Sequence, residues 1–358
     1  MSRPANATID TNAFVANYRH AKTLAPRARA LAVVKANAYG HGAVALAQAL
    51  GDAADAFGVA CCEEAIELRE SGITRPIVVL EGAFEPAELA TAAALDLTLG
   101  VHSPVQLAWI EQTRLTRPLR VWVKVDTGMH RLGFDPSQLN TVWHRLTASR
   151  NVQDIVLMSH FARADEVDMP TTRRQLALFR DTVTGIAAPV SLANSAAVMA
   201  WPDSHGDWIR PGIMLYGSSP LADADPRGTA LRPVMRLESQ VIAIRDLAAG
   251  QEIGYGGRYV CPQPTRVGTV AIGYADGYPR HAPDGTPVAV NGVPTRLIGR
   301  VSMDMITIDL TDLPAARIGD TVQLWGDRIS AAEVARYCGT IAYELFTRVT
   351  RRVHPHPV

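Results

Sequence analysis

The 358-residue sequence has few cysteines and no excess of charge of either sign. Cys61 and Cys62 are neighbours, whereas Cys261 and Cys338 stand far from them and from each other. This spacing fits neither a disulfide framework nor a zinc site, so we expect buried thiols in a reducing compartment. The 35 basic residues balance the 35 acidic ones, which gives no electrostatic reason to expect nucleic acid or an anionic membrane as a partner.

Long apolar runs are missing as well. No run approaches the roughly 20 apolar residues that span a bilayer. Residues 1–20 lack the apolar core of a secretory signal, and no His-Glu-x-x-His pattern marks a metal site. The tail with His354 and His356 is expected to fray. We therefore predict a soluble, cytoplasmic protein without a metal ion.

Strand-like and helical segments alternate between about residues 30 and 215. The strand-like runs cover residues 31–35, 57–61, 77–80, 97–101, 119–125, 155–160, 190–193 and 208–215. Ser103 followed by Pro104 is typical of a helix start, and Gly72 of a helix end. About eight strand-helix units in roughly 200 residues predict an α/β fold, a TIM-like (β/α)8 barrel over residues 1–233 rather than an open sheet.

After Pro233 the pattern becomes rich in strands and turns, which predicts a mainly β domain at residues 234–358. Asn291-Gly292 between apolar runs indicates a type I′ hairpin. One late helix is expected at residues 330–336, where Ser330 and Glu333 fit a capping box. The strand-like stretch at residues 7–9 fits either domain.

Polar residues stand at or near the carboxyl ends of several barrel strands. These residues are Lys35, Lys124, His160, Asn194 and Arg210. Each alone is compatible with an ordinary loop residue. Active sites of such barrels are assembled on this face from several strands, so together the residues predict a site there.

Lys35 ends an apolar strand, where an ammonium is costly to bury and a neutral amine suits Schiff-base chemistry with an aldehyde. The alternative is a lysine whose stem packs while its charge reaches water. The stretch Lys35-Ala-Asn-Ala-Tyr39-Gly-His-Gly closely resembles the attachment motif for pyridoxal phosphate (PLP) in alanine racemases.

The same resemblance recurs in order along nearly the whole chain. The matching segments are KVDTGMHRLG at 124–133, SHFA at 159–162, NSAA at 194–197, RPGIMLYG at 210–217, IGYGGRY at 253–259, GYADG at 273–277, RVSMD at 300–304 and AYE at 342–344. The chain departs from the family pattern at His130, where many members have glycine, which leaves the path of that loop open. The sequence is identified as a member of the alanine racemase family.

This resemblance implies two catalytic residues. Lys35 would hold PLP covalently and, once released, exchange the α-proton on one face of the substrate, while Tyr255 would serve the other face. Racemisation needs groups on both sides, because one fixed base returns the proton where it came from. From its turn sequence alone, Tyr255 also fits an aromatic residue that packs on the β surface.

The resemblance also implies the binding residues for the cofactor. The phosphate would be received by Tyr39, Ser195, Gly212, Ile213 and Tyr343, with His160 against the cofactor ring. Arg210 would donate to the pyridine nitrogen without protonating it, which weakens the ring as an electron sink and disfavours transamination. Without the resemblance, an Arg210 paired with a barrel carboxylate is equally compatible with the sequence.

For the substrate, the resemblance implies that Arg131 and the Met303 backbone bind the carboxylate. Asp304 belongs to the Met303 loop, and Tyr274 to the corridor through which substrate arrives. Lys124 would carry a carbamate that orients Arg131, or remain an ammonium ion paired with Asp126. In the family, Tyr255 and Met303 reach the barrel of a partner chain, which implies a homodimer with shared sites.

We therefore predict PLP-dependent interconversion of L- and D-alanine, supplying or consuming D-alanine for cell-wall peptidoglycan. A racemase of broader specificity is the nearest alternative. A PLP-dependent decarboxylase of the same architecture would need an acidic residue in place of Arg210. A non-catalytic PLP-binding protein would carry only the barrel, so the β domain and Tyr255 argue against it.

Overall fold

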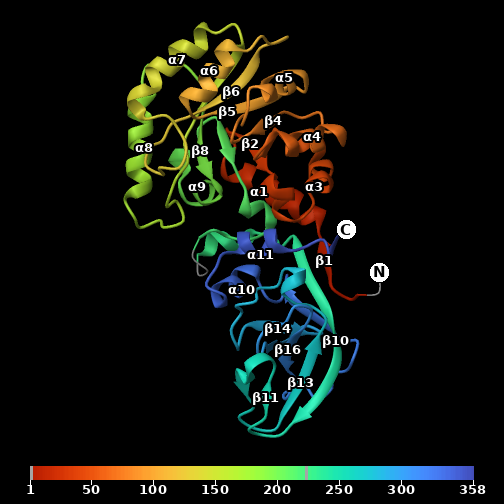
Figure 1. Ribbon diagram of the computed structural model, residues 1–358. Coiled ribbons are helices and arrows are strands. Elements are labelled where there is room, and N and C mark those ends of the chain that lie inside the picture. Colours follow the sequence, from red (N-terminus) through yellow and green to blue (C-terminus); the bar gives the residue numbers. More distant parts are fainter. Residues whose placement is uncertain (1–2, 222–224) are drawn as a thin grey trace. The chain divides into compact units, whose positions relative to one another are not determined.

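The computed structural model describes residues 3–221 and 225–358 and divides the chain into two compact units. The unit that we call the barrel unit comprises Phe14–Ala38 and Ala43–Leu231. The unit that we call the sheet unit comprises Met1–Ala13, Tyr39–Gly42 and Arg232–Val358. Figure 1 labels the elements of both, and each is described by itself. The sequence-based boundary between residues 233 and 234 stays a prediction.

The barrel unit contains a closed barrel of parallel strands, eight within the described residues, as predicted. They are β2 (Arg29–Val33), β3 (Ala56–Val59), β4 (Ile77–Val79), β5 (Leu97–Val101), β6 (Leu119–Lys124), β7 (Val152–Met158), β8 (Val190–Asn194) and β9 (Trp208–Arg210). Every residue of β4 and β5 is buried, because side chains fill the inside of the barrel and helices cover the outside. Strand β9 pairs with β2, and this pairing closes the barrel.

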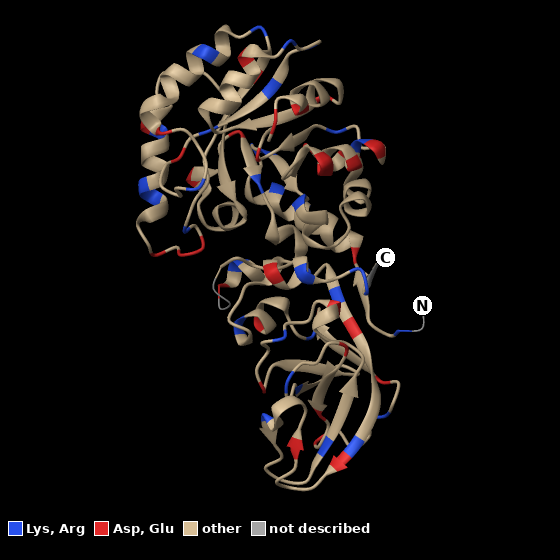
Figure 2. Cartoon of the chain, in the orientation of Figure 1, with Lys and Arg blue, Asp and Glu red and all other residues tan. Residues whose placement is uncertain are grey.

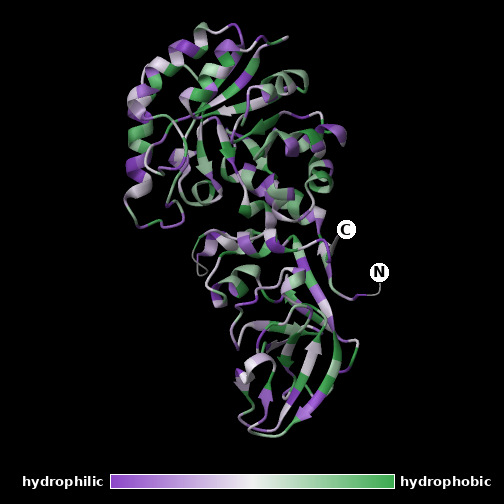
Figure 3. Cartoon of the chain, in the orientation of Figure 1, coloured by the Kyte–Doolittle hydropathy of each residue, from purple (hydrophilic) through white to green (hydrophobic). Residues whose placement is uncertain are grey.

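Helices connect these strands around the outside of the barrel (Figure 1). They are α3 (Ala43–Leu50), α4 (Cys62–Glu70), α5 (Ala87–Ala94), α6 (Pro104–Gln112), α7 (Leu139–Ala148), α8 (Thr171–Thr182) and α9 (Ser195–Ala200). Helix α1 (Thr11–Leu24) precedes β2, and the short segment α2 (Lys35–Tyr39) follows it. The predicted start of α6 is confirmed, because the Ser103 side chain accepts a hydrogen bond from the Gln106 N–H. Gly72 follows α4 with a φ of 86°, a conformation that suits glycine. Figure 3 shows α7 and α8 alternating hydrophobic and hydrophilic residues, as expected of helices with one face on a barrel.

The sheet unit is built on the long strand β10 (Met235–Leu247). Its eight-stranded sheet has the order β15-β14-β17-β10-β1-β18, and β13 pairs with both β10 and β16. The other strands are β1 (Asn6–Ile9), β13 (Thr265–Val270), β14 (Pro287–Val290), β15 (Val293–Arg296), β16 (Ile306–Asp309), β17 (Thr321–Trp325) and β18 (His354–Pro357), with a separate pair of β11 (Glu252–Ile253) and β12 (Tyr259–Val260). The predicted mainly β character of this region is confirmed. Figure 2 shows basic and acidic residues interspersed along both units, consistent with a net charge of zero.

Two local predictions for the sheet unit hold. Asn291 and Gly292, with φ of 48° and 83°, form the predicted tight turn between β14 and β15. Helix α10 (Ala331–Tyr337) begins after Ser330, whose Oγ accepts from the Glu333 N–H at 3.0 Å, which confirms the N-cap half of the predicted capping box.

Two other predictions are wrong. A second late helix, α11 (Ala342–Arg348), follows α10, where the sequence had indicated only one. The tail predicted to fray forms β18, which pairs in parallel with β1 and thereby covers an otherwise open strand edge. No helix in the described part of the chain is long and apolar enough to cross a membrane.

Candidate active site

Lys35 opens a turn of unusual backbone conformation. The three residues after it, Ala36, Asn37 and Ala38, have φ and ψ near 50°. This left-handed conformation costs L-residues roughly 1–2 kcal/mol each, so the surroundings must hold it. The Ala36 N–H donates to the Glu64 carboxylate at 2.7 Å, and Asn37 Oδ1 accepts from the Ala43 N–H at 2.9 Å. Sequence reasoning missed Glu64, because nothing in its spacing from Lys35 signals this contact.

The carboxyl ends of the barrel strands carry a cluster of basic residues. Lys124 ends β6, Arg210 ends β9 and His160 follows β7, so barrel closure brings them to one rim, as predicted. Burial, and then the nearby charges of Arg131, Arg210 and Lys35, together lower the pKa of Lys124 to about 8, against the opposing effect of Asp126. Burial also lowers the pKa of Arg210 to about 10, which leaves it charged at neutral pH.

Asp126, the acidic group whose charge raises the pKa of Lys124, is engaged by other groups. Asp126 Oδ1 accepts from the backbone N–H groups of Gly128, Met129 and His130 at 3.0–3.1 Å, and its Oδ2 lies 3.2 Å from the His130 imidazole. His130 itself has a φ of 53°, a backbone conformation that favours glycine, and this fixes the path of the loop that the sequence left open. The rim therefore retains a positive potential suited to anions.

Arg210 makes its contacts without a carboxylate in the described part of the chain. Its Nη1 donates to Ser191 Oγ at 2.7 Å, and its Nη2 donates to the carbonyl oxygens of Ser159 and Leu192 at 2.6 and 3.1 Å. The alternative of a carboxylate partner is therefore wrong. Nη2 also lies 3.2 Å from His160 Nδ1. Within residues 3–221 and 225–358, the Nε–H of Arg210 donates to no group, so it is available to an added acceptor.

Ser195, Gly212 and Ile213 come together beyond the ends of β8 and β9. Ser195 Oγ accepts from the Gly212 N–H at 2.8 Å, and Ile213 begins a short 3-10 turn, Ile213–Tyr216. The Ile213 N–H donates to no group in the described residues. Barrel enzymes frequently bind phosphate with the loops after their seventh and eighth strands, which is the position of these residues.

In the sheet unit, the structure brings Tyr39 and Tyr343 together. Their ring centroids lie 5.7 Å apart with the ring planes inclined by 37°. Burial raises the pKa of the Tyr39 phenol, so it stays a hydrogen-bond donor at neutral pH.

The remaining predicted site residues lie on loops of the sheet unit. Tyr255 is 72% exposed in a glycine-rich turn, which excludes the alternative that it packs on the β surface. Met303 is 52% exposed. The Tyr274 turn lies against the Met303 loop, because the Tyr274 N–H donates to the Ser302 carbonyl at 3.0 Å. Asp304 pairs with Arg352 at 2.7 Å, a contact that the sequence did not signal.

A cavity of about 470 Å³ lies at the opposite end of the barrel. Arg29, Asp55, Arg75 and Trp208 are among its lining residues, and the Arg29 guanidinium lies 4.1 Å from the Trp208 ring centroid. None of the predicted site residues lines it. Barrel enzymes carry their chemistry at the carboxyl ends of the strands, so the basic rim is the candidate site. No group of three His, Cys, Asp or Glu residues in the described ranges could hold a metal ion.

Comparisons with known proteins find matches over almost the whole chain. Residues 9–220 match the alanine racemase N-terminal domain family, and residues 234–356 match the C-terminal domain family. An alanine racemase of Pseudomonas taetrolens is 55% identical over 349 residues, 98% of each chain, and a catabolic alanine racemase of Pseudomonas putida is 54% identical over the same share.

Solved structures are similar over the whole length as well. The biosynthetic alanine racemase from Pseudomonas aeruginosa has a TM-score of 0.97 and 50% identity, and the match covers 99% of both chains. Alanine racemase from Bartonella henselae, solved with covalently bound pyridoxal phosphate, has a TM-score of 0.90 and 32% identity, again over 99% of both chains. The chain therefore belongs to the alanine racemase family.

Proposed function

We propose that the protein racemises alanine with PLP held covalently on Lys35. The observation that carries this proposal is the basic rim around Lys35, in which the acidic Asp126 is already engaged by backbone N–H groups. Such a rim suits a ligand that brings both a phosphate dianion and a carboxylate. PLP supplies the electron sink that makes removal of the α-proton of an amino acid feasible.

The residues of the barrel unit fit this cofactor. The free Ile213 N–H and the Ser195 hydroxyl would receive the phosphate, with Gly212 in the same turn. The free Nε–H of Arg210 would donate to the pyridine nitrogen, with His160 against the ring. Tyr39 and Tyr343 are proposed as further phosphate ligands on the family resemblance alone.

Lys35 and Tyr255 would exchange the α-proton on opposite faces of the substrate. The exposure of Tyr255 supports its presentation to a partner subunit, so we propose a homodimer in which each site is shared. Because a guanidinium does not readily yield its proton, Arg210 would hold the pyridine nitrogen unprotonated and so favour racemisation over transamination.

Arg131 and the Met303 N–H would bind the substrate carboxylate. The lowered pKa of Lys124 supports a carbamate there, since the neutral amine attacks CO2 to form an N–C bond and releases one proton. The resulting carbamate anion would neutralise the positive charge of Arg131 and orient its guanidinium. Asp304 and Tyr274 would support the substrate loop.

Two relatives of this chain are named for different roles, one catabolic and one biosynthetic. We propose that this protein either supplies D-alanine for peptidoglycan or consumes it, and that its folding domains separate between residues 233 and 234. The alternative of a broad-specificity racemase remains open, whereas Arg210 in place of an acidic residue disfavours a decarboxylase.

A racemisation assay over a panel of amino acids, with a visible spectrum of the purified protein, tests this function. We expect a yellow protein that converts L-alanine into D-alanine faster than it converts larger amino acids. A colourless protein, or one that releases CO2 from its substrates without racemising alanine, would overturn the proposal. Comparable rates across the panel would favour the broad-specificity alternative.

A further inference from the structure

The Met303 loop uses its carbonyl groups for structure and leaves an N–H free. The carbonyls of Ser302 and Met303 accept from the N–H groups of Tyr274 and Ala275, both at 3.0 Å. The Asp304 carbonyl accepts from Arg3 Nη2 at 2.8 Å. By contrast, the Met303 N–H donates to no group in the part of the chain that the structure describes. A loop fixed through its carbonyls can present an N–H to an anion without rearranging.

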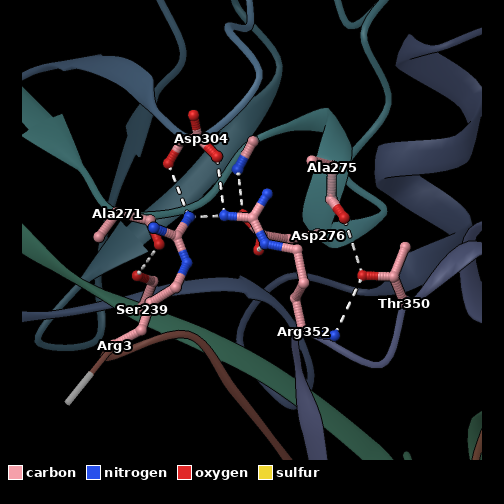
Figure 4. A network of polar contacts seen from close by, with 9 residues as sticks. Arg3, Ser239, Ala271, Ala275, Asp276, Asp304, Thr350 and Arg352 are labelled. Carbon is pink, nitrogen blue, oxygen red and sulfur yellow. Dashed lines mark hydrogen bonds and ion pairs between the residues drawn. The ribbon is translucent and has the colours of Figure 1, made fainter. Parts of the chain in front are cut away.

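Figure 4 shows that this loop is held by two arginines from opposite ends of the chain. Arg3 Nη2 donates to Asp276 Oδ2 at 2.7 Å, and Arg352 Nη2 donates to Asp304 Oδ1 at 2.7 Å. Arg352 Nε lies 3.3 Å from Asp276 Oδ1, so both arginines share the same carboxylate. Asp276 is fully buried, and a buried carboxylate is stable only when its partners remain in place.

Asp276 also fixes the turn on which the Met303 loop rests. Its Oδ2 accepts from the Gly273 N–H at 2.8 Å within the same turn. A Cβ at Gly273 would lie 2.3 Å from the Ser302 carbonyl oxygen, so only glycine permits this close approach of turn and loop. On the other side, Thr350 Oγ1 donates to the Ala275 carbonyl at 2.8 Å. The Asp276 turn therefore lies between the Met303 loop and the C-terminal segment that carries Arg352.

We propose that Arg3, Asp276 and Arg352 are positioning residues, which hold the Met303 loop where its N–H can bind the substrate carboxylate. This inference rests on the proposed function and extends it to residues outside the site described above. Losing one arginine would leave the loop mobile and weaken carboxylate binding in the ground state and transition state alike. Such a loss raises KM and leaves kcat nearly unchanged.

A network that merely ties the two chain ends together predicts a different result. It would lower the melting temperature without changing the affinity for carboxylates. The neighbouring Arg351 offers a matched control, because it is exposed and makes no ion pair in the described residues.

The test compares Arg352→Gln, Arg3→Gln and the double variant with Arg351→Gln, each as the PLP-loaded full-length protein. Steady-state racemisation gives KM and kcat for alanine, and competition gives the inhibition constant of propionate, which has the carboxylate but no amino group. We expect both KM and the propionate constant to rise about fivefold to tenfold in Arg352→Gln and Arg3→Gln, with kcat within about twofold of wild type. Both arginines contact the same two aspartates, so their effects should overlap. The rise in KM of the double variant should therefore be smaller than the product of the rises in the two single variants. Arg352→Lys, which keeps the charge, should recover part of the loss.

Values of KM and of the propionate constant that match those of Arg351→Gln, in variants with normal cofactor absorbance, would overturn the positioning role. A fall in kcat of the same size as the rise in KM would also contradict it. Wild-type protein that does not racemise alanine would instead remove the proposed function, so the two failures are distinguishable.

Discussion

Arg210 Nη2 lies 3.2 Å from His160 Nδ1, and this pair fixes the charge state of the imidazole. Burial, and then the Arg210 charge, lower the pKa of His160 well below its usual value, so the ring is neutral at neutral pH. A guanidinium can only donate, so Nδ1 accepts and the ring proton resides on Nε2. The pair thus carries one positive charge, located on Arg210.

We predict that Arg210→Glu changes the reaction outcome. A carboxyl group can hold a proton at the pyridine nitrogen, which strengthens the ring as an electron sink and allows protonation at the wrong carbon. Racemisation should slow, and pyruvate formed per racemisation event should rise. Both products are measured in one assay, after the variant is shown to bind PLP. An unchanged ratio of racemisation to transamination in the loaded variant would mean that Arg210 does not contact the ring nitrogen.

Lys124 should make the stability of the protein depend on pH. Its pKa is lowered from 10.5 to about 8, so the folded state binds fewer protons than the unfolded state and stability rises between pH 8 and pH 10.5. Below pH 8, the buried ammonium of Lys124 lowers the free energy of unfolding by its full amount, which the size of the pKa shift limits to about 3 kcal/mol. Lys124→Met should therefore unfold at a higher temperature than wild type at pH 7 in CO2-free buffer, and at the same temperature near pH 10.5.

Bicarbonate provides the control for this prediction. A carbamate replaces the unfavourable ammonium by an anion among cations, so bicarbonate should raise the melting temperature of wild type and leave Lys124→Met unchanged. An equal response of both proteins would show that the carbamate does not form on Lys124.

Borohydride should attach the cofactor permanently to Lys35. Reduction of the yellow protein followed by peptide mapping should place the pyridoxyl group on the peptide with Lys35, since Lys35 lies at the basic rim, where its charge lowers the pKa of Lys124. The Lys35→Ala variant should show no covalent label. A label on Lys124 would contradict the assignment.

Mixed dimers should recover activity from two inactive variants. Lys35→Ala and Tyr255→Phe alter different units, and shared sites would give each mixed dimer one site with both residues intact. Random exchange makes half of the dimers mixed, so about a quarter of wild-type activity should return. Subunit exchange is followed by mass spectrometry of differently tagged chains. Complete exchange without any activity would exclude shared sites.

The sequence by itself determined the features that depend on local patterns. The strand-like runs, with Lys124, Asn194 and Arg210 at or near their ends, predicted both the barrel and the rim where we propose the site, because the spacing of apolar residues in a strand and the polar residue near its end are local properties. The Asn291-Gly292 turn followed from the tolerance of both residues for positive φ, and the Ser330 cap from the ability of a serine hydroxyl to accept a backbone hydrogen bond.

Only the tertiary structure decided the features that join distant segments. Strand β18 forms because the edge of β1, near the other end of the chain, offers it hydrogen-bond partners. Arg3 meets Asp276 across 273 positions of sequence, a separation at which no local pattern constrains contact. The left-handed turn after Lys35 is held by Glu64 on another helix. In each case the conformation depends on a partner that only folding brings near. Local sequence patterns therefore could not predict these contacts.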